Sequence, residues 1–196
     1  KRALRALDAS SSPNLSVAAQ NLRDEEATAL GRALTKTTAE LLSLDVSRNA
    51  LGKGLASVFR GAAAHAELET FDASSVPVDA HAMQALASAL TSGFQGLRVL
   101  RLARCQLRVG AVVALCRALR SRGAPSLEEL DLKDNALGDD DPRQEEDEHW
   151  FRAPFFGPLG ALVGDATALD DVDREFKESE WRDGPLALTS LDVSSN

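Results

Sequence analysis

A short leucine pattern returns along the chain and constrains its fold more than any other feature: Leu-x-x-Leu-x-Leu-x-x-Asn-x-Leu. The fuller copies are Leu41, Leu44, Val46, Asn49 and Leu51; Leu97, Leu100, Leu102, Cys105 and Leu107; and Leu127, Leu130, Leu132, Asn135 and Leu137. Looser copies are Leu4, Leu7 and Ala9; Leu68, Phe71, Ala73, Val76 and Val78; and Leu188, Leu191, Val193 and Asn196. A repeat of this length predicts units that stack into a solenoid, because one unit alone cannot bury both of its faces.

Each unit is expected to contain a strand, a turn and a helix. Inward Leu44 and Val46 alternate with outward polar residues such as Asp45, which is the period of a strand with one buried face. The Asn position closes the turn, where an amide side chain can pair with backbone groups, and Cys105 replaces it once as a small buried thiol. Apolar residues at helical spacing predict helices over 24–36, 53–65, 80–90 and 110–122.

The period of the repeat points to a family. Successive copies starting at 41, 68, 97 and 127 are 27, 29 and 30 residues apart, close to the long end of the range for leucine-rich repeats. The chain resembles the ribonuclease-inhibitor-like class of these repeats. Its phrases LRVLRLARCQLRVGAVVALCRAL (97–119) and LTSLDVSSN (188–196) resemble the repeat domain of the CARMIL family, linkers of actin-capping protein. The resemblance implies an α/β horseshoe with parallel strands on the concave face, helices on the convex face, and a role in cytoskeletal regulation.

Composition bounds the size and the setting of the protein. The 196 residues, 44% of them hydrophobic, are enough for one elongated domain covering 1–196. The chain lacks an initiator Met and stops within a copy, so we expect it to be part of a longer protein. It has no apolar run long enough for a membrane span. Cys105 and Cys116 occupy inward positions, which indicates free buried thiols, a reducing compartment and a cytoplasmic location.

The spacing breaks between the copies at 127 and 188, which are 61 residues apart. One interpretation is a repeat with insertions, in which 156–163 is its helix and 139–154 and 169–186 are extra loops. The other is a hidden degenerate repeat with its pattern at Leu159, Leu162, Gly164, Thr167 and Leu169. Three glycines and a proline between 157 and 164 disfavour a strand, so insertion is preferred.

The segment 139–184 differs in composition from the rest of the chain. It holds 15 acidic and 5 basic residues, so its net charge is −10 where the whole chain carries −8. This charge argues against nucleic acid and anionic membranes as partners. The segment also holds six of the nine aromatic residues: Trp150, Phe151, Phe155, Phe156, Phe176 and Trp181. These rings form either a partner-binding protrusion, since Trp is enriched in interface hot spots, or a small local core.

The central outward position of successive copies forms a charged column: Asp8, Asp45, Asp72, Arg101, Asp131 and Asp192. Strands stack about 4.8 Å apart, so like charges in the column repel unless they are solvated or paired. Arg101 is expected to relieve this repulsion between Asp72 and Asp131. The column is either an acidic groove for a basic partner or a solvated face held by cross-strand ion pairs.

Two further cross-strand pairs are expected, Arg98 with Glu128 and Arg104 with Asp134. The candidate partner-binding residues are therefore Trp150, Phe151, Trp181, Asp45, Asp72, Arg101, Arg104 and Asp131.

Motifs of common enzymes and of metal sites are not found. The sequence has no phosphate-binding loop, no nucleophile elbow and no Cys-x-x-Cys, and its three histidines are far apart. We therefore expect no catalytic residue, no metal and no cofactor. The preferred function is a scaffold that binds a protein with a basic surface, in an oligomeric state that the sequence does not give. Alternatives are a RanGAP-like domain, in which Arg101 or Arg104 would assist GTP hydrolysis, and a purely structural solenoid.

Overall fold

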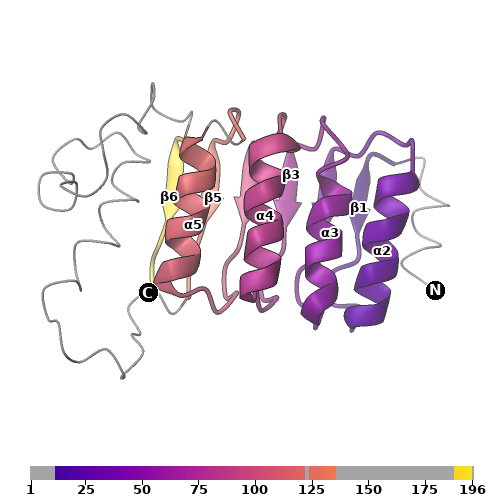
Figure 1. Ribbon diagram of the computed structural model, residues 1–196, viewed down its shortest axis with the longest axis horizontal. Coiled ribbons are helices and arrows are strands. Elements are labelled where there is room, and N and C mark those ends of the chain that lie inside the picture. Colours follow the sequence, from indigo (N-terminus) through magenta and orange to yellow (C-terminus); the bar gives the residue numbers. More distant parts are fainter. Residues whose placement is uncertain (1–11, 122–123, 136–187, 196) are drawn as a thin grey trace, which may run out of the picture.

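The computed structural model describes residues 12–121, 124–135 and 188–195, which form an α/β fold of two layers. Six short strands make one parallel sheet in chain order, from β1 to β6. The α-helices of the described part lie side by side in a row along one face of this sheet (Figure 1). The elements are β1 (Asn14–Ser16), α2 (Asp24–Lys36), β2 (Ser43–Asp45), the 3-10 helix η1 (Gly52–Gly54), α3 (Leu55–Ala62), β3 (Thr70–Asp72), α4 (Ala80–Ser92), β4 (Val99–Arg101), α5 (Val109–Arg120), β5 (Glu129–Asp131) and β6 (Ser190–Asp192).

The register of the sheet follows the leucine pattern. The middle residue of every strand pairs with the middle residue of the next, in the order Leu15, Leu44, Phe71, Leu100, Leu130 and Leu191. Leu44, Leu100 and Leu130 are fully buried. The prediction of parallel strands with one buried face is therefore confirmed for β1 to β5, whereas Leu191 of β6 is half-buried.

The first strand comes from a different copy than the sequence pattern indicated. β1 contains Leu15, and Val17 and Leu22 continue its buried positions, so this copy starts at Ser12 and lies 29 residues before the copy at Leu41. The pattern is hidden because Ser12 and Gln20 stand at the first leucine and at the Asn position. Leu4, Leu7 and Ala9 lie outside the described residues.

The position of Asp8 beside Asp45 in the charged column was predicted wrongly. Ser16 pairs with Asp45 in the sheet, and its hydroxyl donates to Asp45 Oδ2 at 3.1 Å.

The strands on either side of the long spacing are neighbours in the sheet. β5 pairs directly with β6, with Leu130 opposite Leu191 and Asp131 opposite Asp192. This pairing is the one that the insertion interpretation predicts, since a hidden repeat would separate the two strands. The segment 139–184 itself lies outside the described residues.

Apolar side chains fill the space between the two layers. Three phenylalanines lie at its centre: the ring centroids of Phe59 and Phe71 are 5.4 Å apart, and those of Phe71 and Phe94 are 6.0 Å apart. Helices α2 and α3 approach so closely that a Cβ on Gly31 would lie 2.2 Å from the Ser57 carbonyl oxygen. This approach requires glycine there, because a side chain would collide with the backbone of α3.

The helices agree with the predicted ranges except after β2. The range 53–65 was predicted as one helix, but the chain forms η1 followed by the shorter α3. Within the described residues, no helix combines the length and the apolar character needed to cross a bilayer.

Candidate functional site: the open face of the sheet

The helices lie along one face of the sheet, and the opposite face is called here the open face (Figure 1). The outward side chains of the six strands lie on this open face. All twelve outward strand residues are exposed or half-buried. Five of them are acidic, one is basic and none is aromatic; the acids are Asp45, Asp72, Glu129, Asp131 and Asp192, and the base is Arg101. The strand part of the open face is therefore acidic.

The aspartates of the central column each close the turn that follows their own strand. Their Oδ1 atoms accept hydrogen bonds from the backbone N–H two residues later: Asp45 from Ser47 at 3.0 Å, Asp72 from Ser74 at 2.8 Å, Asp131 from Lys133 at 2.9 Å and Asp192 from Ser194 at 2.9 Å. Such Asx turns favour Asp at this position of the repeat. At Asp192 the backbone N–H of Ser194 lowers the pKa of the carboxyl, which favours its ionised form.

Arg101 has a different partner from the one that the column suggested. It was expected between Asp72 and Asp131, but its guanidinium forms an ion pair with Glu129 of the next strand, with Nη2 and Oε1 2.9 Å apart. The reason is that the two aspartates point to the amides of their own turns, whereas Glu129 lies diagonally across from Arg101 on the same face. Arg101 thus occupies the column but is neutralised from the flanking position.

The other two expected ion pairs are confirmed. Arg98 contacts Glu128, and Arg104 contacts Asp134, each with an N–O distance of 2.9 Å. All ion pairs within the described residues thus join the copy that contains β4 to the copy that contains β5. Since these side chains are largely exposed, we expect the pairs to fix the surface geometry more than the stability.

These pairs predict how the open face titrates. The Arg98 guanidinium lowers the pKa of Glu128, and the Arg104 guanidinium lowers the pKa of Asp134, in each case chiefly through a side-chain hydrogen bond. A carboxyl pKa lowered by folding stabilises the fold above its ordinary value of about 4, and this contribution is lost as the pH falls through the lowered pKa. We expect Arg104→Gln to raise the pKa of Asp134 while the pKa of Glu128 stays low, measured by NMR titration of the side-chain carboxyls.

The converse variant is the control for this prediction. Arg98→Gln should raise the pKa of Glu128 and leave the pKa of Asp134 low. If either variant moves both carboxyls equally, the shifts come from the general field of the protein and not from the pairs.

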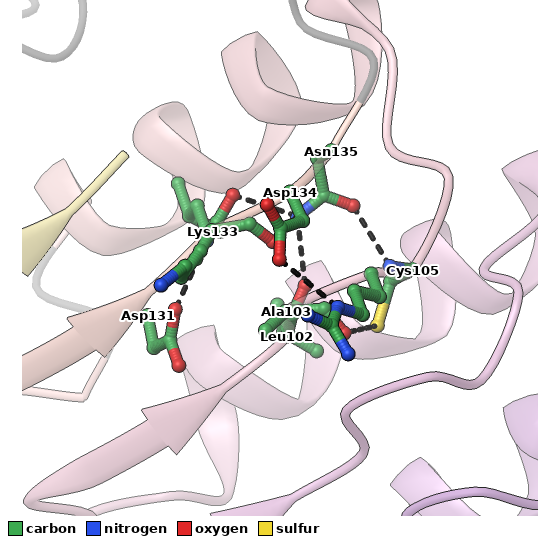
Figure 2. Close-up of polar contacts among 9 residues, drawn as sticks. Leu102, Ala103, Cys105, Asp131, Lys133, Asp134 and Asn135 are labelled. Carbon is green, nitrogen blue, oxygen red and sulfur yellow. Dashed lines mark hydrogen bonds and ion pairs between the residues drawn. The ribbon is translucent and has the colours of Figure 1, made fainter. Parts of the chain in front are cut away.

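The Asn position ties each turn to the copy before it. Figure 2 shows Asn135, whose Oδ1 accepts from the backbone N–H groups of Cys105 at 2.9 Å and Leu107 at 3.1 Å. Its Nδ2 donates to the carbonyl oxygens of Leu102 at 2.9 Å and Leu132 at 2.8 Å. One amide side chain therefore satisfies backbone groups of two successive copies, as the sequence predicted for a sharp turn.

Cys105 reproduces only part of this network. Its thiol donates to the Ala73 carbonyl oxygen over 3.2 Å, the same repeat position that Asn135 Nδ2 contacts one copy later. Burial raises the pKa of Cys105 to about 12, so the thiol stays protonated at neutral pH. Cys105 and Cys116 are both buried thiols that form no disulfide, as predicted.

A second column follows the strands, in the turns at the carboxyl edge of the sheet. At the same offset in every described copy, one residue has a left-handed backbone, and none of these residues is glycine. They are Ala19, Arg48, Ser75, Arg104, Asp134 and Ser195, with φ between 52° and 60°. Their backbone N–H groups continue the ladder, for example Arg48 to the Ser74 carbonyl at 2.9 Å and Ser75 to the Ala103 carbonyl at 2.7 Å. We call these six residues the turn column.

A hollow of about 340 Å³ opens over the turn column. Eight of its nine lining residues have polar or charged side chains, and they come from four successive copies: Ser47, Arg48, Asp72, Ser74, Ser75, Ala103, Arg104, Lys133 and Asp134. Sequence patterns pointed to Arg104 here but missed Arg48 and Ser75. The signal that could have found them is their shared offset, seven residues after the first leucine position of each copy.

The residues predicted to bind a partner are thus placed in part. Asp45, Asp72, Arg101 and Asp131 follow one another in register across the open face, and Arg104 lies in the turn beyond β4. Trp150, Phe151 and Trp181 lie outside the described residues. Within the described ranges no three His, Cys, Asp or Glu side chains are grouped to hold a metal ion.

Comparison with known proteins supports the repeat. A family model described as Leucine Rich repeat matches residues 123–141, a stretch that contains β5 and the turn closed by Asn135. The parallel sheet with helices along one face is compatible with a leucine-rich-repeat fold. The match names no particular class within these repeats. No curated protein matches the chain.

Proposed function

We propose that the chain is a leucine-rich-repeat module that binds a protein partner through the open face and the neighbouring acidic segment 139–184. Within this proposal the sheet curves as the concave side of a horseshoe of the ribonuclease-inhibitor-like class. The partner carries a basic surface, and the CARMIL-like phrases favour a cytoskeletal regulator in the cytoplasm, where buried free thiols remain reduced.

The observation that carries the proposal is the uncovered, acidic strand face. Five carboxylates against one guanidinium lie on this sheet, and all of them except Asp192 belong to the inner strands β2 to β5, which have a neighbouring strand on both sides. Asx turns and ion pairs fix these side chains before any partner arrives. A surface organised in advance loses little conformational freedom on binding, and its charge steers a basic partner toward it.

The segment 139–184 enters the proposal through its composition and its place in the chain. It lies in the chain between β5 and β6, two neighbouring strands that carry Glu129, Asp131 and Asp192. Its net charge of −10 has the same sign as the strand face. The aromatic side chains that the open face lacks are abundant in this segment, and they supply hot-spot anchors for the partner.

The proposal is tested with a partner captured by cross-linking to the full chain and then purified. We expect Trp150→Ala or Trp181→Ala to weaken binding by at least about 2 kcal/mol, roughly 30-fold in Kd, measured by calorimetry. Raising the salt concentration from about 50 to about 200 mM should slow association, because exposed charges are screened over about 8–10 Å.

Two further variants separate the surfaces. Arg101→Ala changes the strand face, and deletion of 139–154 changes the acidic segment. The control is His81→Ala, at an exposed position on α4. The proposed surfaces are wrong if the partner binds all of these variants as tightly as it binds the parent chain, namely the deletion, the two Trp variants and Arg101→Ala.

The RanGAP-like alternative gains nothing from the geometry. Glu129 engages Arg101 through both Nε and Nη2, and Arg101 would have to release this carboxylate before it could stabilise phosphoryl transfer. A single-turnover assay against a panel of small GTPases tests this alternative directly.

A further inference from the structure

In the turn column, a serine has one arginine on each side. Arg48, Ser75 and Arg104 belong to consecutive copies and share one left-handed backbone conformation, with φ of 56°, 60° and 57°. Backbone hydrogen bonds continue the sheet ladder through these turns, and ladder strands are about 4.8 Å apart. The two arginine backbones are therefore about 10 Å apart, with the Ser75 backbone between them.

Positive charge and hydrogen-bond donors are in excess in the hollow. Arg48, Arg104 and Lys133 face two carboxylates, and each carboxylate already accepts a hydrogen bond: Asp72 from Ser74 N–H and Asp134 from Arg104 Nε. The ion pair uses Arg104 Nε, which leaves both Nη groups of this arginine as donors, and its side chain is 67% exposed. The Arg48 guanidinium is exposed and makes no hydrogen bond or ion pair to the part of the chain that is described.

We propose that this hollow binds one anionic group, the carboxylate or phosphate of a partner protein's side chain, between Arg48 and Arg104 and above Ser75. The inference rests on the proposed protein binding and names a contact for it. Guanidinium groups present planar pairs of donors that match the oxygens of carboxylate and phosphate, and such charge-assisted bonds are the strong ones.

The shape of the hollow favours a side chain of a docked protein over a small metabolite. Sites for small molecules are concave and enclose most of the ligand, whereas this hollow is open to solvent and its two arginines are exposed. The volume of about 340 Å³ accommodates a whole acidic or phosphorylated side chain. A partner can thus place its side chain here while its main body covers the strands.

The inference also predicts how positive and negative charges are distributed on the binding surface of the partner. The strand face has five acids and one base, whereas the turn column has two bases and one acid, with Lys133 beside it. A partner that complements both has basic residues over the strands and an acidic or phosphorylated residue over the turns. A partner with the reversed order would bring like charges together, so the arrangement selects orientation as well as identity.

The test is a titration of the full ¹⁵N-labelled chain with inorganic phosphate, and separately with acetate, at constant ionic strength, followed by NMR. We expect saturable shifts confined to the amides around Ser74, Ser75 and Arg104. Arg48→Gln with Arg104→Gln should weaken the anion at least tenfold. Arg32→Gln with Arg60→Gln removes the same charge from exposed positions on α2 and α3, and should leave the affinity unchanged.

Arg48→Gln alone keeps the test valid if the double variant folds poorly, because the Arg48 side chain holds no ion pair within the described residues. Saturation by phosphate but not acetate supports a phosphorylated side chain, and saturation by both supports a carboxylate as well. No saturation, or equal weakening by the two double variants, overturns the anion site. That result would leave the proposed protein binding intact, whereas a phosphate site without any protein partner would overturn the proposed function alone.

Discussion

Phe71→Ala should lower the free energy of unfolding by about 3–5 kcal/mol, the cost of truncating a buried aromatic side chain. Phe71 is the middle residue of β3 and is fully buried. Its ring centroid is 5.4 Å from that of Phe59 and 6.0 Å from that of Phe94, so its removal opens a cavity between the sheet and the helices. The loss is measured by urea denaturation, where a lower midpoint at constant slope reports stability alone.

Phe71→Leu is the matched control for that cavity. The equivalent residues of the neighbouring strands are Leu44 and Leu100, so the repeat already accepts leucine at this position. We expect the conservative substitution to cost less than about 1.5 kcal/mol. A loss below about 1 kcal/mol for Phe71→Ala would show that the buried face of β3 has been assigned wrongly.

The repeat made the sheet predictable and its first strand difficult to find. Where leucines fill the pattern, as at Leu44 and Leu100, alternation fixes which side chains point inward, because a shift of one residue would expose them all. The first described copy keeps inward Leu15 and Val17 but has Ser12 and Gln20 at two key positions. Stacking against β2 is enough to form this strand, and a pattern search cannot detect that contribution.

The sequence predicted which charged residues line up on the open face, but it did not predict every ion pair that they form. The pairs of Arg98 and Arg104 link residues at the same offset of successive copies, so repeat alignment finds them. Arg101 pairs diagonally because the neighbouring aspartates are already bonded to their own turns. Competition between a backbone amide and a side-chain cation depends on local geometry, which the sequence does not carry.

The turn column was missed for a related reason. Left-handed backbone usually indicates Gly, Asn or Asp, yet Arg48, Ser75 and Arg104 adopt it. The tight turn after each strand imposes this conformation at one offset, whatever residue stands there. Residue type gives no signal in such a case, and only the shared offset in the repeat does.

Asn49→Ala should lower the free energy of unfolding as much as Phe71→Ala does, although it removes no apolar side chain from the core. Asn49 is 6% exposed, and its Oδ1 accepts from the N–H groups of Gln20 at 3.1 Å and Leu22 at 2.9 Å. Its Nδ2 donates to the carbonyl oxygens of Val17 and Val46 at 2.9 Å and of Ser47 at 3.0 Å.

Alanine leaves four of these five backbone groups without the Asn49 side chain as their partner in a site from which water is largely excluded, whereas Ser47 O still accepts from Ala19 N–H at 3.0 Å. Each unsatisfied buried group costs about 1–3 kcal/mol, so we expect a total loss of roughly 3–5 kcal/mol in urea denaturation. Asn14→Ala, at an exposed position of β1, should change stability by no more than about 0.5 kcal/mol.

Cys105→Ala provides the decisive comparison, because Cys105 stands at the same repeat position with a thiol, a weak hydrogen-bonding group, in place of the amide. Its thiol donates to Ala73 O over 3.2 Å and more weakly to Ala103 O over 3.5 Å, and its sulfur faces the backbone N–H groups of Val76 and Ser75. We therefore expect Cys105→Ala to cost about 1 kcal/mol, well below Asn49→Ala. Equal losses for the two variants would mean that the position acts through its volume, and that the amide ladder between copies does not hold the turns.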